Sequence, residues 1–291
     1  MDPLLFFQAV KSGLLIGSVY GLMSVGFTLI IGVMGIANFA QSEWVTLGMI
    51  LSYVLYTTVG IDPLLSLPLL FVGGFVLGVL VERFVIFKAI DAPFVTQLGV
   101  TLALLYIMRY TYLLTWGPFP KEISTWYSVH SINVSSIQLS VPMMIAGILA
   151  SVLCILLYPL LKHTRLGLAI RASAQNRDLA YIHGIDIPRV YIIAFGIGVG
   201  LTCIAGGLLS LSYYISYDAG ATYALIIFLV IAIGGCRSLL GSVVGGLIIG
   251  LIQAVSATVF SPSMKYAFIA LLFLLITALR PQGLFVRRGQ L

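Results

Sequence analysis

The feature that most limits the fold of this chain is a succession of long apolar stretches separated by short polar ones. The stretches lie at about 10 to 34, 44 to 58, 63 to 82, 94 to 115, 140 to 161, 188 to 212, 222 to 235, 241 to 260 and 264 to 280. Roughly 20 apolar residues cross a bilayer as an α-helix, because any other backbone would leave unpaired amides in lipid. We therefore expect an all-α polytopic integral membrane protein with about eight to ten transmembrane helices, some of them short or broken.

Charge supports this fold class. Only 8% of the 291 residues are charged, too few to coat the water-facing surface of a soluble protein of this size. Residues 1 to 291 are therefore expected to form a single transmembrane domain surrounded by lipid, and the N-terminus, which lacks a signal-peptide pattern, is expected to stay attached. The net charge of +6 does not come from basic runs with interleaved aromatics, so no nucleic-acid partner is expected.

The positions of the basic residues predict an orientation, since Lys and Arg are retained on the cytoplasmic side. A cytoplasmic loop at about 162 to 188 places most of them inside: Arg83, Lys88, Lys162, Arg165, Arg171, Arg177, Arg189, Arg237, Arg280, Arg287 and Arg288. Lys11, Arg109, Lys121 and Lys265 are left outside or near the outer end of a span. The loop at about 116 to 139 is then extracytoplasmic.

Several kinds of chemistry are missing. The chain has no Gly-Lys pair and hence no phosphate-binding P-loop, so it is not expected to hydrolyse ATP by itself. It has no metalloprotease or serine-hydrolase motif, and its three histidines lack metal-ligand spacing. We expect no catalytic residue, no bound metal and no cofactor. An ion-coupled carrier would normally show acidic groups in mid-span, and here they are few.

A polar break interrupts the first apolar region at residues 35 to 44, where Asn38, Gln41, Ser42 and Glu43 occur together. Two interpretations are open. The break is either a cytoplasmic turn with Asn38 ending one helix and Ser42 starting the next, or a broken helix that shapes a substrate pathway.

A polar island at residues 171 to 189 is the other departure from the apolar pattern. A helix from about 168 to 183 fits it, with Gly184 as a C-terminal stop and Pro188 in the first turn of the next helix. The island is either a rigid ridge for a cytoplasmic partner or a solvated connector.

Residues 178 to 184, "DLAYIHG", resemble the E-A-A-x-x-x-G coupling loop of ABC importer permeases, with Asp for Glu and Leu for the first Ala. In order along the chain, the segments at 13 to 43, 163 to 186, 232 to 253 and 279 to 285 resemble the permease family of branched-chain amino acid ABC importers. This resemblance runs nearly end to end.

The resemblance implies which residues meet partners. The matching residues are Ala172, Ala174, Asp178, Ala180 and Gly184 for the ATPase-facing loop, and Asn38, Phe39, Ala40 and Glu43, beside Gln41, for the substrate pathway. We add Arg171 and Arg177 as partner contacts, because guanidinium groups pair bidentately with carboxylates. The chain departs from the family where Gln41-Ser42 replace His-Gly, and where Gln175-Asn176 replace an acidic pair.

The resemblance also implies an assembly and a function, namely ATP-driven import of a small, branched-chain amino acid by alternating access. The implied partners are a second homologous permease subunit, two cytoplasmic ATP-binding subunits that hold ATP and Mg²⁺, and an extracytoplasmic solute-binding protein. The implied location is the cytoplasmic (inner) membrane of a bacterium or archaeon. Other cargoes (urea, short amides, aromatic carboxylates), an ion-coupled secondary carrier and a membrane scaffold remain alternatives.

Overall fold

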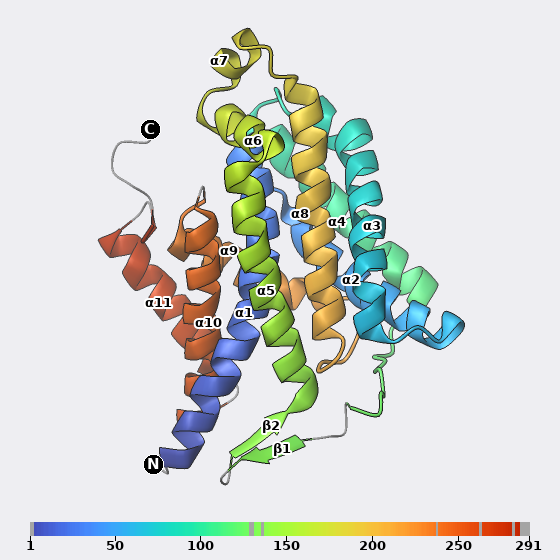
Figure 1. Ribbon diagram of the computed structural model, residues 1–291, viewed down its shortest axis with the longest axis vertical. Helices are drawn as coiled ribbons and strands as arrows, with labels where there is room; N and C mark the ends of the chain where they lie inside the picture. Colours follow the sequence, from blue (N-terminus) through green and yellow to red (C-terminus); the bar gives the residue numbers. More distant parts are fainter. Residues whose placement is uncertain are drawn as a thin grey trace.

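The computed structural model describes residues 3–127, 131–134, 137–236, 238–261, 264–280 and 283–285. It is a helical bundle, as the sequence predicts (Figure 1). The helices are α1 (Pro3–Met34), α2 (Glu43–Val54), α3 (Pro63–Val81), α4 (Phe94–Trp116), α5 (Val141–His163), α6 (Arg165–Gln175), α7 (Arg177–Ile182), α8 (Ile187–Leu209), α9 (Ala219–Gly234), α10 (Leu239–Val259) and α11 (Lys265–Leu279). Short 3-10 turns (Phe39–Ser42, Phe87–Ala89) and π turns (Leu55–Val59, Glu82–Ile86) lie beside them.

Six helices of the described residues are long and apolar enough to cross a membrane: Leu4–Met34, Pro63–Ala89, Phe94–Trp116, Val141–His163, Ile187–Leu209 and Leu239–Val259. Two shorter apolar helices, Ala219–Gly234 and Ala267–Leu279, accompany them. The first span begins several residues earlier than its hydropathy indicates. Arg237, Arg287 and Arg288, which the orientation prediction used, lie outside the described residues.

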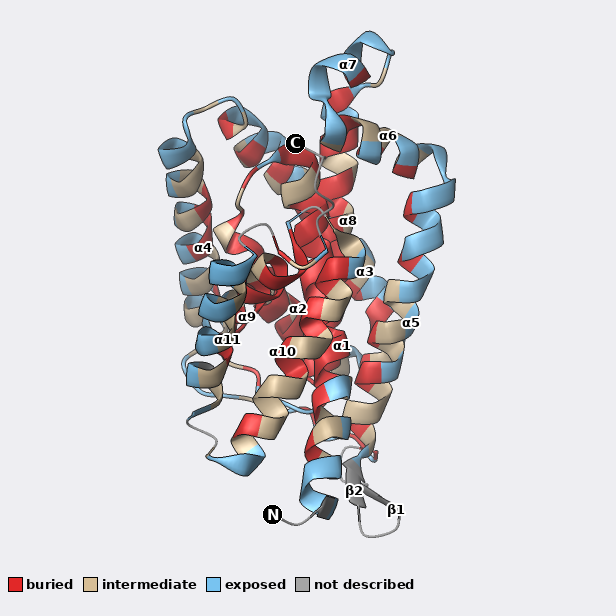
Figure 2. Cartoon of the chain, turned by 90° about the vertical axis from the view of Figure 1, so that its left-hand side faces the viewer, coloured by how far each residue is buried: buried red, intermediate tan, exposed pale blue. Residues whose placement is uncertain are grey.

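The centre of the bundle is formed by α1 and α8. Within their most apolar windows 78% and 83% of residues are buried, against 22% for α3 and α4 (Figure 2). Glycines allow close packing of α1 on both neighbours: a Cβ on Gly26 would overlap the carbonyl oxygen of Gly198 on α8, and a Cβ on Gly17 would lie 2.8 Å from the carbonyl oxygen of Gly246 on α10. Small residues let backbones approach in lipid, where the hydrophobic effect does not drive helices together.

The loop that was predicted to be extracytoplasmic contains a feature that its sequence did not predict. Strands β1 (Ser131–Val134) and β2 (Ile137–Ser140) form an antiparallel pair with Ser131 opposite Ser140. Lys121 and Ile215 exchange backbone hydrogen bonds nearby. In Figure 1 this hairpin lies at the end of the bundle opposite α6 and α7.

The polar island is two helices, so the prediction of one helix from about 168 to 183 is wrong. Asn176 ends α6 with an extended backbone (φ −154°). Its side chain accepts a hydrogen bond from Leu179 N and so caps the N-terminus of α7. This capping bond competes with continued helix. Gly184 follows α7 in the left-handed region (φ +80°), and Pro188 lies in the first turn of α8, both as predicted.

Candidate functional site

The polar break lies inside the bundle. Asn38, Gln41, Ser42 and Glu43 are each at most 2% exposed, so the break is not a solvent-exposed turn. Ser42 precedes α2 at its N-cap position, as the turn interpretation expects. Asn38 does not end a helix; its side chain accepts from Ala40 N and starts the short 3-10 turn that precedes α2. We call residues 36–43 the buried break. Irregular backbone at membrane depth is tolerated where it is enclosed by protein or lines a cavity.

The buried break is bonded to α8. Gln41 Nε2 donates to Thr202 Oγ1 at 2.6 Å, and Thr202 donates in turn to the carbonyl oxygen of Gly198. Asn38 Nδ2 donates to Gln41 Oε1 at 3.4 Å. These bonds satisfy amides that would otherwise be costly away from water. They also couple the break to the central helix.

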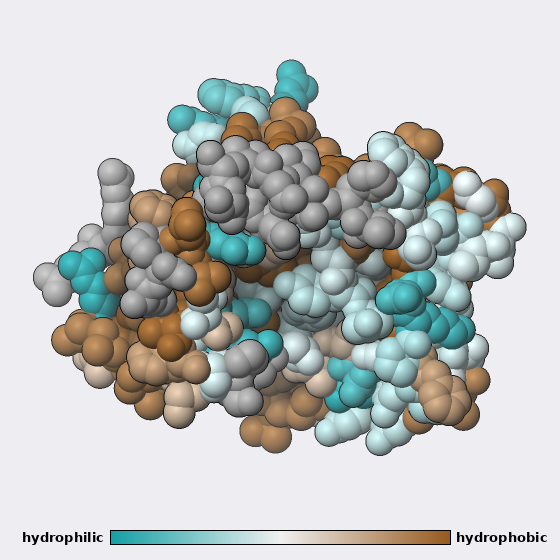
Figure 3. All heavy atoms as spheres, turned by 90° about the horizontal axis from the view of Figure 1, so that it is seen from below, coloured by the Kyte–Doolittle hydropathy of each residue, from teal (hydrophilic) through white to brown (hydrophobic). Residues whose placement is uncertain are grey.

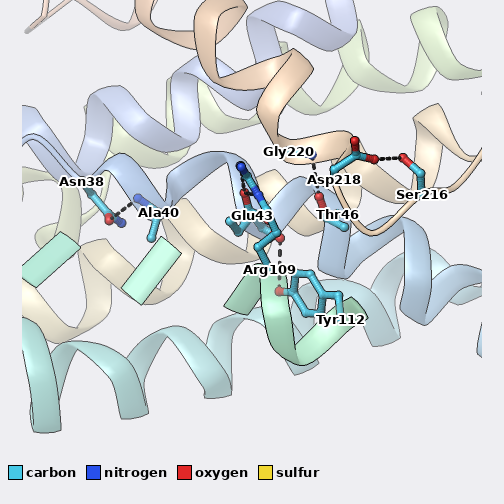
Figure 4. A network of polar contacts seen from close by, with 9 residues as sticks. All are labelled: Asn38, Ala40, Glu43, Thr46, Arg109, Tyr112, Ser216, Asp218 and Gly220. Carbon is cyan, nitrogen blue, oxygen red and sulfur yellow. Dashed lines mark hydrogen bonds and ion pairs between the residues drawn. The ribbon is translucent and has the colours of Figure 1, made fainter. Parts of the chain in front are cut away.

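An ion pair joins the buried break to α4 (Figure 4). Arg109 Nε lies 3.0 Å from Glu43 Oε1, and the Glu43 side chain has no exposed surface. Tyr112, three residues further along α4, donates its hydroxyl to the carbonyl oxygen of Glu43 at 3.2 Å. The two charged residues are 66 positions apart, so no local sequence signal paired them.

The start of α9 meets the start of α2 at this point. Gly220 N–H donates to Thr46 Oγ1 at 2.7 Å, and a Cβ on Gly220 would lie 2.8 Å from Glu43 Oε1 (Figure 4). At about 1.5 Å per residue, α2 with the π turn that continues it to Val59 and α9 span about 25 and 24 Å, less than the roughly 30 Å of a hydrocarbon core. Short helices that begin together inside a bundle are typical of transporter binding regions.

The residues predicted to face an ATPase lie together at the end of the bundle opposite the β-hairpin. They lie on or directly after α6 and α7, and we call these two helices (residues 165–182) the ridge. Leu168, Leu179, Tyr181 and Ile182 are more than half exposed on this ridge, whereas Ala180 is buried. Asp178 and Gly184 are exposed, and Ala172 and Ala174 are half-buried. Figure 1 shows α6 at the end of α5 and α7 beyond the ends of the spans.

Arg171 and Arg177, the two arginines predicted to contact a partner, are bonded within the chain. Arg177 Nη1 lies 2.6 Å from Asp91 Oδ1, in the loop before α4, and its guanidinium is 5.9 Å from the ring of Tyr191. The hydrogen bond to Asp91 raises the pKa of Arg177. Arg171 donates to the carbonyl oxygen of Lys162 at 3.0 Å. The ridge is thus tied to α5, to α8 and to the loop before α4.

Within the residues that the structure describes, no group of three or more His, Cys, Asp or Glu side chains could hold a metal ion. The candidate site has two separate parts. One is a buried polar junction, in which the buried break is bonded to Thr202 of α8 and Arg109 of α4, beside the start of α9. The other is the exposed ridge.

Comparison with known proteins gives a consistent result. A family model described as branched-chain amino acid transport system / permease component matches residues 9–277. The high-affinity branched-chain amino acid transport system permease protein LivH of Escherichia coli K12 is 27% identical, covering 98% of this chain and 96% of that protein. BraD of Pseudomonas aeruginosa, of the same description, is 24% identical over 97% of this chain and 96% of that protein. A probable LivH of Methanocaldococcus jannaschii is 28% identical over 80% of this chain and 75% of that protein. No solved structure matches.

Proposed function

The chain belongs to the family of branched-chain amino acid transport system permease components, and from this premise we propose that it is the membrane-spanning subunit of an ABC importer. It is a multi-pass protein of the inner membrane. The proposed cargo is a small amino acid with a branched side chain: leucine, isoleucine or valine. The comparisons lend no support to urea, amides or aromatic carboxylates as cargo.

The observation that carries the proposal is the apolar surface of the ridge. Leu179, Tyr181 and Ile182 are 55%, 71% and 74% exposed on a six-residue helix that stands outside the spans. Exposed apolar side chains rimmed by charges mark protein interaction sites. A cytoplasmic ATP-binding subunit fits this surface, since the chain has no P-loop of its own.

The proposed mechanism is alternating access driven from the ridge. Closure of two ATP-binding subunits, which hold the ATP and Mg²⁺, displaces the ridge as a rigid element. Residues 183–186 join α7 directly to α8, and α8 is bonded to the buried break through Thr202. A displacement at the ridge therefore has a short route to the polar junction inside the bundle. A second homologous permease subunit and an extracytoplasmic solute-binding protein complete the proposed assembly.

Transport by the reconstituted assembly tests the proposal. The chain is placed in proteoliposomes with its sister permease, ATP-binding subunits and solute-binding protein, and uptake of radiolabelled leucine and urea is measured with and without ATP. We expect leucine uptake only with ATP, and none with an ATPase-dead partner. Leucine uptake by the purified chain alone, driven by an ion gradient, contradicts the importer and supports a secondary carrier.

A further inference from the structure

A cavity of about 430 Å³ opens at the outer end of the bundle, between α1, the start of α5, the end of α10 and the start of α11. Figure 3 looks onto this end, where hydrophilic and hydrophobic side chains are mixed. The polar part of its lining consists of Gln8, Ser12, Tyr213, Gln253, Thr258 and Lys265. Its volume lies in the usual range of small-molecule sites, about 300 to 1,000 Å³.

The helix spacing gathers these polar groups. Gln8, Ser12 and Tyr20 are separated by multiples of four residues on α1, which places them along one ridge of that helix. Gln253 lies on α10 opposite them, and the Tyr20 hydroxyl donates to Gln253 Oε1 at 2.9 Å. Because the amide oxygen is engaged by Tyr20, the amide nitrogen is the group that Gln253 offers to the cavity.

The charge and the apolar lining indicate what would bind. Lys265 is the one charged residue among the described residues that line the cavity. Ile16 and Met143 supply apolar surface beside it. A cation and an amide donor suit an oxyanion, and the apolar wall suits a hydrocarbon body.

Polar groups continue inward from the cavity along α1. Ser24, one turn beyond Tyr20, is fully buried, and its hydroxyl has no hydrogen-bond partner among the described residues. Thr28, a further turn on, lies 2.5 Å from the hydroxyl of Ser242. The neighbouring Phe27 contacts Phe228, which in turn contacts Phe39 of the buried break. A series of hydroxyl groups thus leads inward from the cavity as far as Thr28, and the aromatic contacts of Phe27 and Phe228 link it to the buried break.

We propose that the outer cavity is the first binding site of the transported amino acid on this chain. The substrate carboxylate binds the ammonium group of Lys265 and the amide nitrogen of Gln253, and the aliphatic side chain packs on Ile16 and Met143. This inference rests on the proposed function and names the substrate atoms that the outer end recognises.

The test is leucine binding to the full importer in nanodiscs, in the absence of the solute-binding protein. Radiolabelled leucine is competed with 4-methylpentanoate, which keeps the carboxylate, and with isoamylamine, which keeps only the amine. We expect 4-methylpentanoate to compete and isoamylamine not to. Lys265→Met and Gln253→Leu should each weaken leucine binding about tenfold, the effect of losing one charge-assisted or buried hydrogen bond.

Lys121→Met is the matched control. Lys121 is also at the outer end, but its ammonium lies 4.4 Å from the ring centre of Trp116 and it does not line this cavity. Thermal unfolding and basal ATP hydrolysis are measured for every variant, so that loss of folding is recognised. If the Lys265 and Lys121 variants bind leucine equally well while the wild type transports it, the inference is wrong and the proposed function stands. If the wild type shows no ATP-dependent leucine uptake, the proposed function itself fails.

An anionic lipid headgroup presents similar oxyanion chemistry, so the binding assay is run in two lipids. In nanodiscs of phosphatidylcholine alone and of phosphatidylcholine with phosphatidylglycerol, we expect the same leucine affinity and the same loss in Lys265→Met. If phosphatidylglycerol displaces leucine from the wild type and not from Lys265→Met, the cavity holds a lipid phosphate and the inference is overturned.

Discussion

Glu43 at the start of α2 and Arg109 on α4 form an ion pair within the bundle, with Arg109 Nε 3.0 Å from Glu43 Oε1. The same helix α4 donates two further side-chain bonds to this region, from Tyr112 to Glu43 O at 3.2 Å and from Thr101 to Ala37 O at 3.4 Å. Most of α4 is otherwise exposed on the rim of the bundle. These polar bonds, together with the buried side chains of Leu104 and Leu105, hold α4 against the bundle.

Replacing Arg109 by Met should destabilise the protein by about 3 kcal/mol, because the Glu43 carboxylate is left buried without its counter-charge. Glu43 has no exposed side-chain surface, whereas Arg109 is 20% exposed. The free energy of unfolding is measured in detergent or by thermal unfolding. The double variant Glu43→Gln/Arg109→Met should recover much of the loss, since no buried charge remains.

Arg189→Met controls for the loss of an arginine as such, because Arg189 pairs with Asp186 at the surface with 81% of its side chain exposed. An exposed pair contributes about 0 to 1 kcal/mol, so this variant should unfold almost as the wild type does. Equal effects of the Arg109 and Arg189 variants contradict an energetically important buried pair.

Breaking the Arg177–Asp91 pair should impair transport while leaving the stability of the protein almost unchanged. Both side chains are substantially exposed, so Arg177→Asp should change the unfolding free energy by no more than about 1 kcal/mol. We expect a severalfold loss of leucine uptake per ATP hydrolysed, because like charges at 177 and 91 detach α7 from the loop before α4.

Exchanging both charges distinguishes an internal role from a partner contact. Asp91→Arg combined with Arg177→Asp restores an attractive pair and should restore most of the coupling between hydrolysis and uptake. If uptake stays as low as in Arg177→Asp alone, the positive charge at 177 faces the ATP-binding subunit instead of Asp91.

The sequence predicted the buried break and the ridge but not their internal contacts. Hydropathy is a local property, and it located the spans. The partners of Glu43 and Arg177 depend on which loops and helices the fold brings together. Burial of Asn38 and Gln41 was left open, because four polar residues between apolar stretches fit a solvated turn equally well. Asn176 had a recognisable signal, since Asn is a good N-cap and a poor interior helix residue.

Gly184 should tolerate Asn better than Val. Its φ of +80° lies in the left-handed region, and no atom within 4 Å would contact a Cβ there, so backbone strain alone sets the cost. That cost is about 1 to 2 kcal/mol for a β-branched residue and smaller for Asn. Co-purification of the ATP-binding subunits should be reduced for Gly184→Val and close to wild type for Gly184→Asn. Equal capture with both variants contradicts a requirement for this turn in presenting the ridge.

Gly48→Ala should destabilise the protein by several kcal/mol, since a Cβ at Gly48 on α2 would overlap the carbonyl oxygen of Cys203 on α8. Backbone atoms are on the other side of the contact, so relief requires that α2 and α8 move apart. That movement would also strain the bond from Gln41 to Thr202, the residue next to Cys203 on α8.

Gly73→Ala on α3 is the matched control, because no atom lies within 4 Å of its added methyl group. Alanine there should be neutral or stabilising by up to about 1 kcal/mol. Thermal unfolding compares the two variants, and leucine uptake is then measured for any Gly48 variant that folds. A Gly48→Ala protein as stable as Gly73→Ala means that α2 can shift freely against α8, and the tight α2–α8 contact then cannot be what holds the buried break in place.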